Sequence, residues 1–212
     1  MNKANYSLIS LLAFTALFTW SCKKDDGKEP SKNGNGNPQT QEALLYFRAT
    51  LDDVKYDYSV YDGSESYDMS SNSSGNIGSG GSQSTFIYGS GSHDTETGES
   101  FNIALGTLVI KEGGRPDFET FKHFVMNANY HYSVGAKNGI EIVFWDKDGK
   151  EWSTSKGDQT KSDFEIVSIT ERTLLWVPYI EILATFNCAL YDDDGNSIIL
   201  KDGSSLYSVE NI

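Results

Sequence analysis

The feature that most constrains the fold of this 212-residue chain is a period of two in its apolar residues. Successive side chains of a β-strand point to opposite faces of the sheet, so such alternation predicts a strand with one buried face. The longest example is formed by Ile180, Ile182, Ala184, Phe186, Cys188 and Leu190. A second is formed by Phe101, Ile103, Leu105, Thr107 and Val109. These segments predict a sheet that packs around one apolar core.

Alternating segments of this kind recur along most of the chain after residue 43, with Asp-Asp and Asp-Gly turn signals between them. They predict roughly ten antiparallel strands and an all-β domain over residues 43–212. A β-sandwich is the first expectation for such a pattern, and a closed β-barrel is the alternative. One helix is expected in the segment 113–126, where Pro116 suits a first helical position and phenylalanines recur at helical spacing.

Two Asp-x-Asp-Gly stretches, 146–149 and 192–195, resemble half of a calcium-binding loop. An EF-hand loop needs a glutamate at its twelfth position, where this chain has Gly157 and Gly203. Asp-Gly also suits the positive φ of a tight hairpin, so we interpret both stretches as turns. A weak calcium site built from the two loops remains the alternative. Asp202-Gly203 predicts a further turn near the end of the chain.

The first residues have the parts of a secretory signal. Lys3 precedes a largely apolar run over residues 8–20, which is shorter than the roughly 20 apolar residues that span a bilayer. The run ends in Ser21-Cys22, which resembles a bacterial lipobox, although Thr19 stands where that pattern has leucine. The resemblance implies cleavage after residue 21 and lipid attachment to Cys22. We therefore expect a signal peptide over 1–21 and a lipid anchor.

The composition changes twice along the chain. Residues 22–42 are polar and rich in Asn, Gly, Lys and Pro, so we expect a disordered tether. Its start, Lys23 to Asp26, resembles the surface-export signal of Bacteroidetes lipoproteins. Residues 63–84 are rich in Gly and Ser and predict a long loop or a weak edge strand.

The formal net charge of −13 argues against nucleic acid as a partner. The chain contains no nucleophile elbow, His-Glu-x-x-His motif or phosphate-binding loop, and its three histidines are scattered. We expect no enzyme activity, no cofactor and no metal site. Cys188 lies on the apolar face of its strand, which predicts a buried thiol in preference to a reactive nucleophile.

Aromatic residues offer a candidate binding surface. Trp145, Trp152 and Trp176 could form a stacking platform for sugars, or they could fill the core, which we favour for Trp145 and Trp152. Trp176 and Tyr179 flank Pro178 in an expected loop, so these two residues are the candidate ligand-binding pair.

The segment 138–166, "NGIEIVFWDKDGKEWSTSKGDQTKSDFEI", and the segment 184–209, "ATFNCALYDDDGNSIILKDGSSLYSV", carry a resemblance to a known group. From Gly98 to its end the chain resembles an uncharacterised family of Bacteroidetes lipoproteins with a domain of unknown function. The resemblance implies a secreted, β-rich domain and transfers no functional residue except the lipid-bearing Cys22.

Together these patterns predict a protein anchored by lipid to the outer membrane, facing either the cell surface or the periplasm. We expect a non-catalytic ligand-binding module, with a glycan as ligand. One alternative is an adhesin or an envelope-assembly or structural protein, which would expose an edge strand or an apolar patch to a protein partner. The other is a hydrolase, which would need two carboxylates converging in a cleft.

Overall fold

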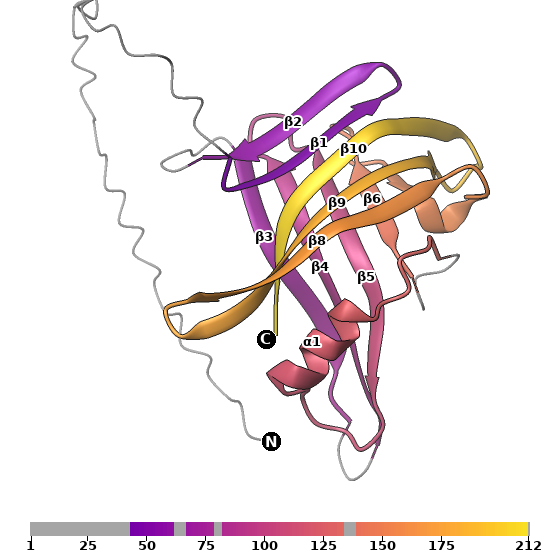
Figure 1. Ribbon diagram of the computed structural model, residues 1–212. Coiled ribbons are helices and arrows are strands. Elements are labelled where there is room, and N and C mark those ends of the chain that lie inside the picture. Colours follow the sequence, from indigo (N-terminus) through magenta and orange to yellow (C-terminus); the bar gives the residue numbers. More distant parts are fainter. Residues whose placement is uncertain (1–42, 62–66, 79–81, 134–138, 212) are drawn as a thin grey trace, which may run out of the picture. The chain divides into compact units, whose positions relative to one another are not determined.

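The computed structural model describes residues 43–61, 67–78, 82–133 and 139–211. Within these residues it contains ten β-strands, one α-helix and one short 3-10 helix, which confirms the all-β prediction (Figure 1). The strands are β1 (Leu45–Leu51), β2 (Val54–Val60), β3 (Tyr67–Asn76), β4 (Ser84–Asp94), β5 (Ser100–Ile110), β6 (Glu141–Trp145), β7 (Glu151–Ser153), β8 (Asp163–Leu174), β9 (Val177–Tyr191) and β10 (Ser197–Glu210). The helices are α1 (Phe118–Met126) and η1 (Thr154–Lys156).

The strands form one antiparallel sheet in the order β2-β1-β10-β9-β7-β6-β5-β4-β3, and β8 pairs with β9 off this path. The sheet curls into a nearly closed barrel, so the structure follows the barrel alternative and not the first expectation of a sandwich. A sandwich consists of two separate sheets packed face to face. Here all ten strands belong to one sheet in which neighbouring strands are hydrogen-bonded. The end strand β3 also contacts β10, where the backbone N–H of Glu210 donates to Ser71 Oγ at 2.9 Å.

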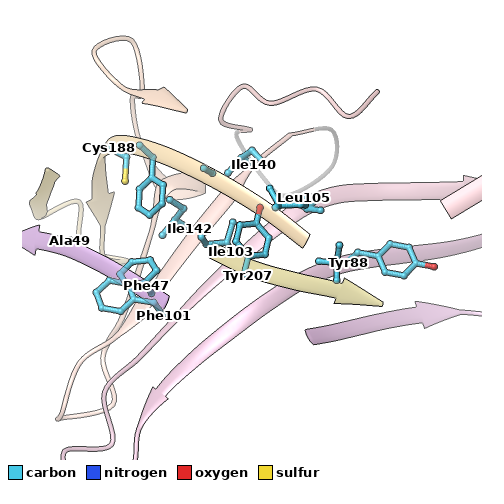
Figure 2. Packing of buried hydrophobic residues seen from close by; sticks show 14 of the residues in the cluster. Phe47, Ala49, Tyr88, Phe101, Ile103, Leu105, Ile140, Ile142, Cys188 and Tyr207 are labelled. Atoms are coloured by element: carbon cyan, nitrogen blue, oxygen red, sulfur yellow. The ribbon is translucent and has the colours of Figure 1, made fainter. Parts of the chain in front are cut away.

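The inward faces of the strands fill the barrel with apolar side chains (Figure 2). The Phe101 ring stacks on Phe47 at a centroid distance of 4.2 Å and on Phe144 at 4.5 Å. All six alternating residues of β9 from Ile180 to Leu190 are buried, as their period predicts. The burial of Cys188 among them confirms the prediction of a buried thiol.

The alternation predicted for β5 holds only through Leu105. Gly106 has a φ of +101°, and the register between β4 and β5 shifts at this point. The shift turns Leu108 and Ile110 toward the core and leaves Val109 42% exposed. A bulge of this kind reverses which residues face inward, and a period of two does not anticipate it.

The turn predicted at Asp202-Gly203 is wrong, because β10 runs through both residues. The register between β9 and β10 shifts between Leu200 and Gly203, and Asp202 has a φ of +52°. This is a β-bulge within one strand. A Cβ on Gly203 would lie 2.3 Å from the Phe186 ring, so glycine here permits close packing across the sheet.

The Gly/Ser-rich region predicted as a loop near 63–84 contains β3, so the loop prediction is wrong for Tyr67–Asn76. The edge-strand alternative fits, because β3 ends the strand order. Its small residues have structural uses. A Cβ on Gly75 would lie 2.6 Å from the Phe86 ring, and Ser71 Oγ accepts the hydrogen bond from Glu210 N of β10.

The predicted helix is confirmed as α1, with its start corrected. Asp117 caps it, since the carboxylate of Asp117 accepts a hydrogen bond from Thr120 N at 2.7 Å. Pro116 therefore precedes the cap and is not the first helical residue. Phe121 and Val125 are buried and seat the helix against the barrel.

The predicted signal peptide, Cys22 and the tether lie outside the described residues. Within the part of the chain that the structure describes, no helix is long and apolar enough to cross a membrane.

Candidate functional site

A polar groove of about 590 Å³ lies against the outer face of β9 and β10. Its wall is the connection before β8, and its floor is formed mainly by outward-facing residues of the two strands, with the buried residues Cys188 and Leu200 also bordering it. The lining residues are Asp158, Thr160, Lys161, Ser162, Asp163, Asn187, Cys188, Ala189, Tyr191, Ile199, Leu200 and Lys201. Most of these side chains carry hydrogen-bonding groups, but at least half of the exposed lining surface is apolar, so the groove suits a ligand with both polar groups and apolar faces.

The groove exists because β9 changes partner along one edge. β9 pairs with β8 as far as Asn187 and with β7 at Tyr191. Between these points the Gln159 side chain takes the place of a strand. Gln159 Nε2 donates to the carbonyl of Ala189 at 2.7 Å, and its Oε1 accepts from Ala189 N at 3.4 Å. This pairing holds the wall of the groove along the edge of β9.

Asn187 ties the two sides of the groove together. Its Nδ2 donates to both carboxylate oxygens of Asp163 at 3.2 Å, and its Oδ1 accepts from Asp202 N at 2.9 Å. Asp202 lies in the β10 bulge, so the bulge turns its N–H toward Asn187. One amide side chain therefore connects the start of β8 to β10 and sets the spacing between them.

Tyr191 supplies the aromatic ring of the groove. Its hydroxyl donates to the carbonyl of Asp158 at 3.0 Å, which fixes the ring against the wall. A Cβ on Gly157 would lie 2.3 Å from this ring, so the ring rests directly on the Gly157 backbone. The ring is half-buried and held at both its edge and one face, which favours a preorganised contact surface.

The two aspartates of the groove have hydrogen-bond partners, whereas its two lysines form no ion pair among the described residues. Asp158 accepts from both the backbone and the hydroxyl of Thr160, and Asp163 accepts from Asn187. Lys161 and Lys201 line the same groove and make no ion pair within the described residues. Two lysines without a carboxylate partner are notable on a chain whose net charge is −13.

Cys188 borders the groove but is 4% exposed. Burial raises the pKa of its thiol to about 12, against a lowering effect of the hydrogen bond with Tyr132. Almost none of the nucleophilic thiolate exists at neutral pH, so Cys188 acts as a core residue.

The two Asp-x-Asp-Gly stretches are turns. Asp146 Oδ1 accepts from the backbone N–H groups of Asp148 and Lys150, and Asp192 Oδ1 does the same within its own turn. Lys150 Nζ also contacts Asp192 Oδ2 at 2.6 Å, which joins the two turns. These carboxylates accept hydrogen bonds from the protein itself, as the turn interpretation requires. Among the described residues, no group of three acidic, histidine or cysteine side chains could hold a metal ion.

A second feature is the tip of the β8–β9 hairpin. The sequence predicts a loop around Pro178, but β9 begins at Val177 and Pro178 pairs with Thr173 of β8. The connection is a two-residue turn of Leu175 and Trp176, with φ angles of +47° and +73°. Leu175 is 85% exposed and Trp176 is 94% exposed. The tip therefore presents apolar side chains to solvent on a tight turn.

The structure does not bring the candidate pair Trp176 and Tyr179 together into a binding site. Trp176 lies at the hairpin tip, Tyr179 is half-buried within β9, and neither lines the polar groove. Trp152 is partly buried against the core, whereas Trp145 is half-buried and does not belong to it.

Sequence reasoning missed the residues that build the groove. In the sequence, Asn187 and Tyr191 occupy ordinary outward-facing positions of an alternating strand. The one local signal was the Gly157-Asp158-Gln159 stretch, whose polar residues interrupt the pattern of strands.

Comparisons with known proteins assign no family to this chain. No protein-family model, no curated protein and no solved structure matches it. The resemblance to Bacteroidetes lipoproteins therefore stays a prediction from the sequence.

Proposed function

We propose that this protein is a non-catalytic binding module of the cell envelope, held at the outer membrane by an acylated Cys22, that captures a saccharide. The observation that carries the proposal is the polar groove, in which Tyr191 of the floor is fixed against the wall. The module needs no cofactor in this role.

Saccharides present many hydroxyl groups and apolar ring faces, so their sites combine hydrogen-bonding side chains with an aromatic ring. The groove offers both, because the ammonium groups of Lys161 and Lys201 and the hydroxyl of Ser162 lie in the same cavity as the Tyr191 ring. Asn187 and Tyr191 are held in place by partners on other segments. Such fixed side chains lose little conformational entropy when a ligand binds.

The two unpaired lysines favour a saccharide that carries a carboxylate or sulfate group. Lys161 and Lys201 belong to different segments, the wall and the floor, yet line one cavity. An anionic substituent placed between them gains charge-assisted hydrogen bonds that a neutral sugar lacks.

A glycan array of neutral and acidic saccharides, followed by titration calorimetry on the best binder, tests this proposal. Tyr191→Ala removes the ring and should weaken binding about tenfold, the order expected for one aromatic contact. Tyr191→Phe keeps the ring and loses only the bond to Asp158, so it is the matched control. Lys201→Ala should weaken binding of acidic saccharides and leave neutral ones unchanged. Absence of any array binding, or equal affinity of the Tyr191→Ala chain, would remove the groove as the site.

Hydrolysis is a second candidate because Asp158 and Asp163 both line the groove. Each carboxylate is engaged by neighbouring donors, Thr160 and Asn187, so both serve the structure of the groove. Binding is therefore the better-supported function. Release of reducing sugar from the bound glycan, lost in both Asp158→Asn and Asp163→Asn, would establish hydrolysis instead.

A further inference from the structure

We propose that the tip of the β8–β9 hairpin, residues 174–177, inserts into a zwitterionic lipid surface, which carries no net charge. The proposal rests on the proposed lipid anchor for its membrane, and it concerns a part of the molecule other than the groove. The tip would then orient the domain on the membrane that carries it.

Exposed apolar side chains follow one another without interruption at the tip. Leu174 is 65% exposed, Leu175 85%, Trp176 94% and Val177 54%. The other exposed aliphatic residues, such as Val109 in β5 and Ile77 after β3, are single positions far apart in the sequence. Single exposed apolar residues are normal on a protein surface, whereas a contiguous set marks a contact surface.

The tip projects from the body of the sheet. The last pair between β10 and β9 joins Glu210 to Tyr179, so Val177 and Pro178 pair only with β8 (Figure 1). On β8, the residues from Glu171 to Leu174 are all exposed. The tip is therefore convex and narrow, which suits penetration of a soft apolar phase.

No charged residue lies between Arg172 and Glu181, and the nearest charges are neutralised. Arg172 pairs with Glu181 at 3.2 Å, and Glu171 pairs with Lys122 at 2.6 Å. A neutral tip enters a lipid surface without desolvating a charge. The net charge of −13 repels anionic lipids, so a zwitterionic surface fits the whole chain better.

The chemistry of the tip favours lipid over a sugar or a protein. A sugar needs hydrogen-bonding partners beside the ring, and Leu174, Leu175 and Val177 provide none. Specific protein interfaces carry about one hydrogen bond per 100–200 Å². The indole of Trp176 instead has an apolar body and one N–H, which suits the boundary between acyl chains and headgroups.

Topology places the tip at the end of the sheet where the chain joins the domain. β1 and β9 both run antiparallel to β10, so they are parallel to each other. Tyr46 lies opposite Leu206, and Leu206 lies opposite Leu183. At about 3.3 Å per residue, the stretch from Leu183 back to Val177 extends about 20 Å past the level of Tyr46. Leu45, the first residue of β1, thus lies on the side of the sheet toward which the tip points.

Quenching of indole fluorescence by brominated lipid tests the insertion. The full chain is reconstituted from detergent into phosphatidylcholine vesicles, with and without bromine on the acyl chains. The contribution of Trp176 is the quenching that disappears in Trp176→Phe. We expect this contribution in the wild-type chain, its loss in a Leu174→Ser/Leu175→Ser chain that keeps Trp176, and its retention in the matched control Val109→Ser.

Equal quenching of the wild-type and Trp176→Phe chains would overturn the proposal, and it is the result expected if the tip served a protein partner. The lipid anchor is tested in a separate experiment. Fatty-acid labelling in a diderm host is compared between the wild-type chain and Cys22→Ala. Trp176-dependent quenching without labelling would support the tip and remove the anchor. Labelling without Trp176-dependent quenching would overturn the tip and leave the anchor standing.

Discussion

Two hairpins of this protein turn with the same backbone conformation and opposite side-chain chemistry. The β1–β2 turn has Asp52 and Asp53 at φ angles of +46° and +67°. The β8–β9 turn has Leu175 and Trp176 at +47° and +73°. Positive φ at both central residues is the conformation that a two-residue hairpin favours, and Asn, Asp and Gly tolerate it best.

The aspartate turn is built into the sheet. Asp52 Oδ1 accepts from Ile199 N at 3.0 Å, and Asp52 N donates to the carbonyl of Ile199 at 3.1 Å. Leu175 and Trp176 are bulky at a conformation that costs of order 1–3 kcal/mol for such residues. The first turn matches its residues to its backbone. The second does not, which agrees with the proposal that its residues serve a contact outside the folded chain.

The largest effect is expected when the apolar pair is placed in the polar turn. Asp52→Leu/Asp53→Trp adds backbone strain and removes the hydrogen bond that Ile199 N donates to the Asp52 carboxylate. We expect the free energy of unfolding to fall by about 2–4 kcal/mol, measured by urea denaturation. An unchanged free energy would mean that the conformation carries no cost for these residues.

A smaller effect of opposite sign is expected at the hairpin tip. Leu175→Asn/Trp176→Gly supplies the residues that the turn prefers, so the free energy of unfolding should rise by about 1–2 kcal/mol. Asp52→Asn/Asp53→Gly is the matched control, because it changes a turn that is already suitable. A loss of stability in the tip variant would show that Leu175 or Trp176 contributes to the fold.

The smallest effect is expected in the pH dependence of stability. It compares a turn whose hydrogen bonds end on a carboxylate with the turn at the hairpin tip, which has none. Hydrogen bonds from Lys150 and Asn196 hold the pKa of Asp192 well below its ordinary value of 3.8. A lowered folded-state pKa gives stability that is present above the ordinary value and lost as the pH falls below it. Denaturation midpoints from pH 7 to acid should therefore fall less steeply in Asp192→Asn than in the wild-type chain. The tip variant Leu175→Asn/Trp176→Gly should keep the wild-type slope, and an equal slope in Asp192→Asn would contradict the assignment.

Much of the fold could be predicted because a strand encodes its buried face locally. The six inward residues of β9 and the Asp-Gly turns at 146–149 and 192–195 need no distant partner to be recognised. The predictions failed where a bulge intervened. At Gly106 and Asp202, a shift in pairing with a neighbouring strand decides which side chain faces inward and whether the chain turns.

The candidate groove could not be predicted from local sequence patterns. Its wall comes from 158–163, and its floor comes from 187–191 and 199–201, three segments brought together by the pairing of β8, β9 and β10. The apolar character of Trp176 was visible in the sequence, but its exposure depends on where β10 ends.

The sequence by itself determined the all-β class, the inward faces of the strands outside the bulges, the short helix and the turns at 52–53, 146–149 and 192–195, because these follow from side-chain period and backbone preference over a few residues. The tertiary structure alone decided that one sheet curls toward closure, that Asn187 spans a groove, and that a strained Leu-Trp turn projects from the sheet. Those features depend on strand order and register, which are set by the packing of residues far apart in the chain.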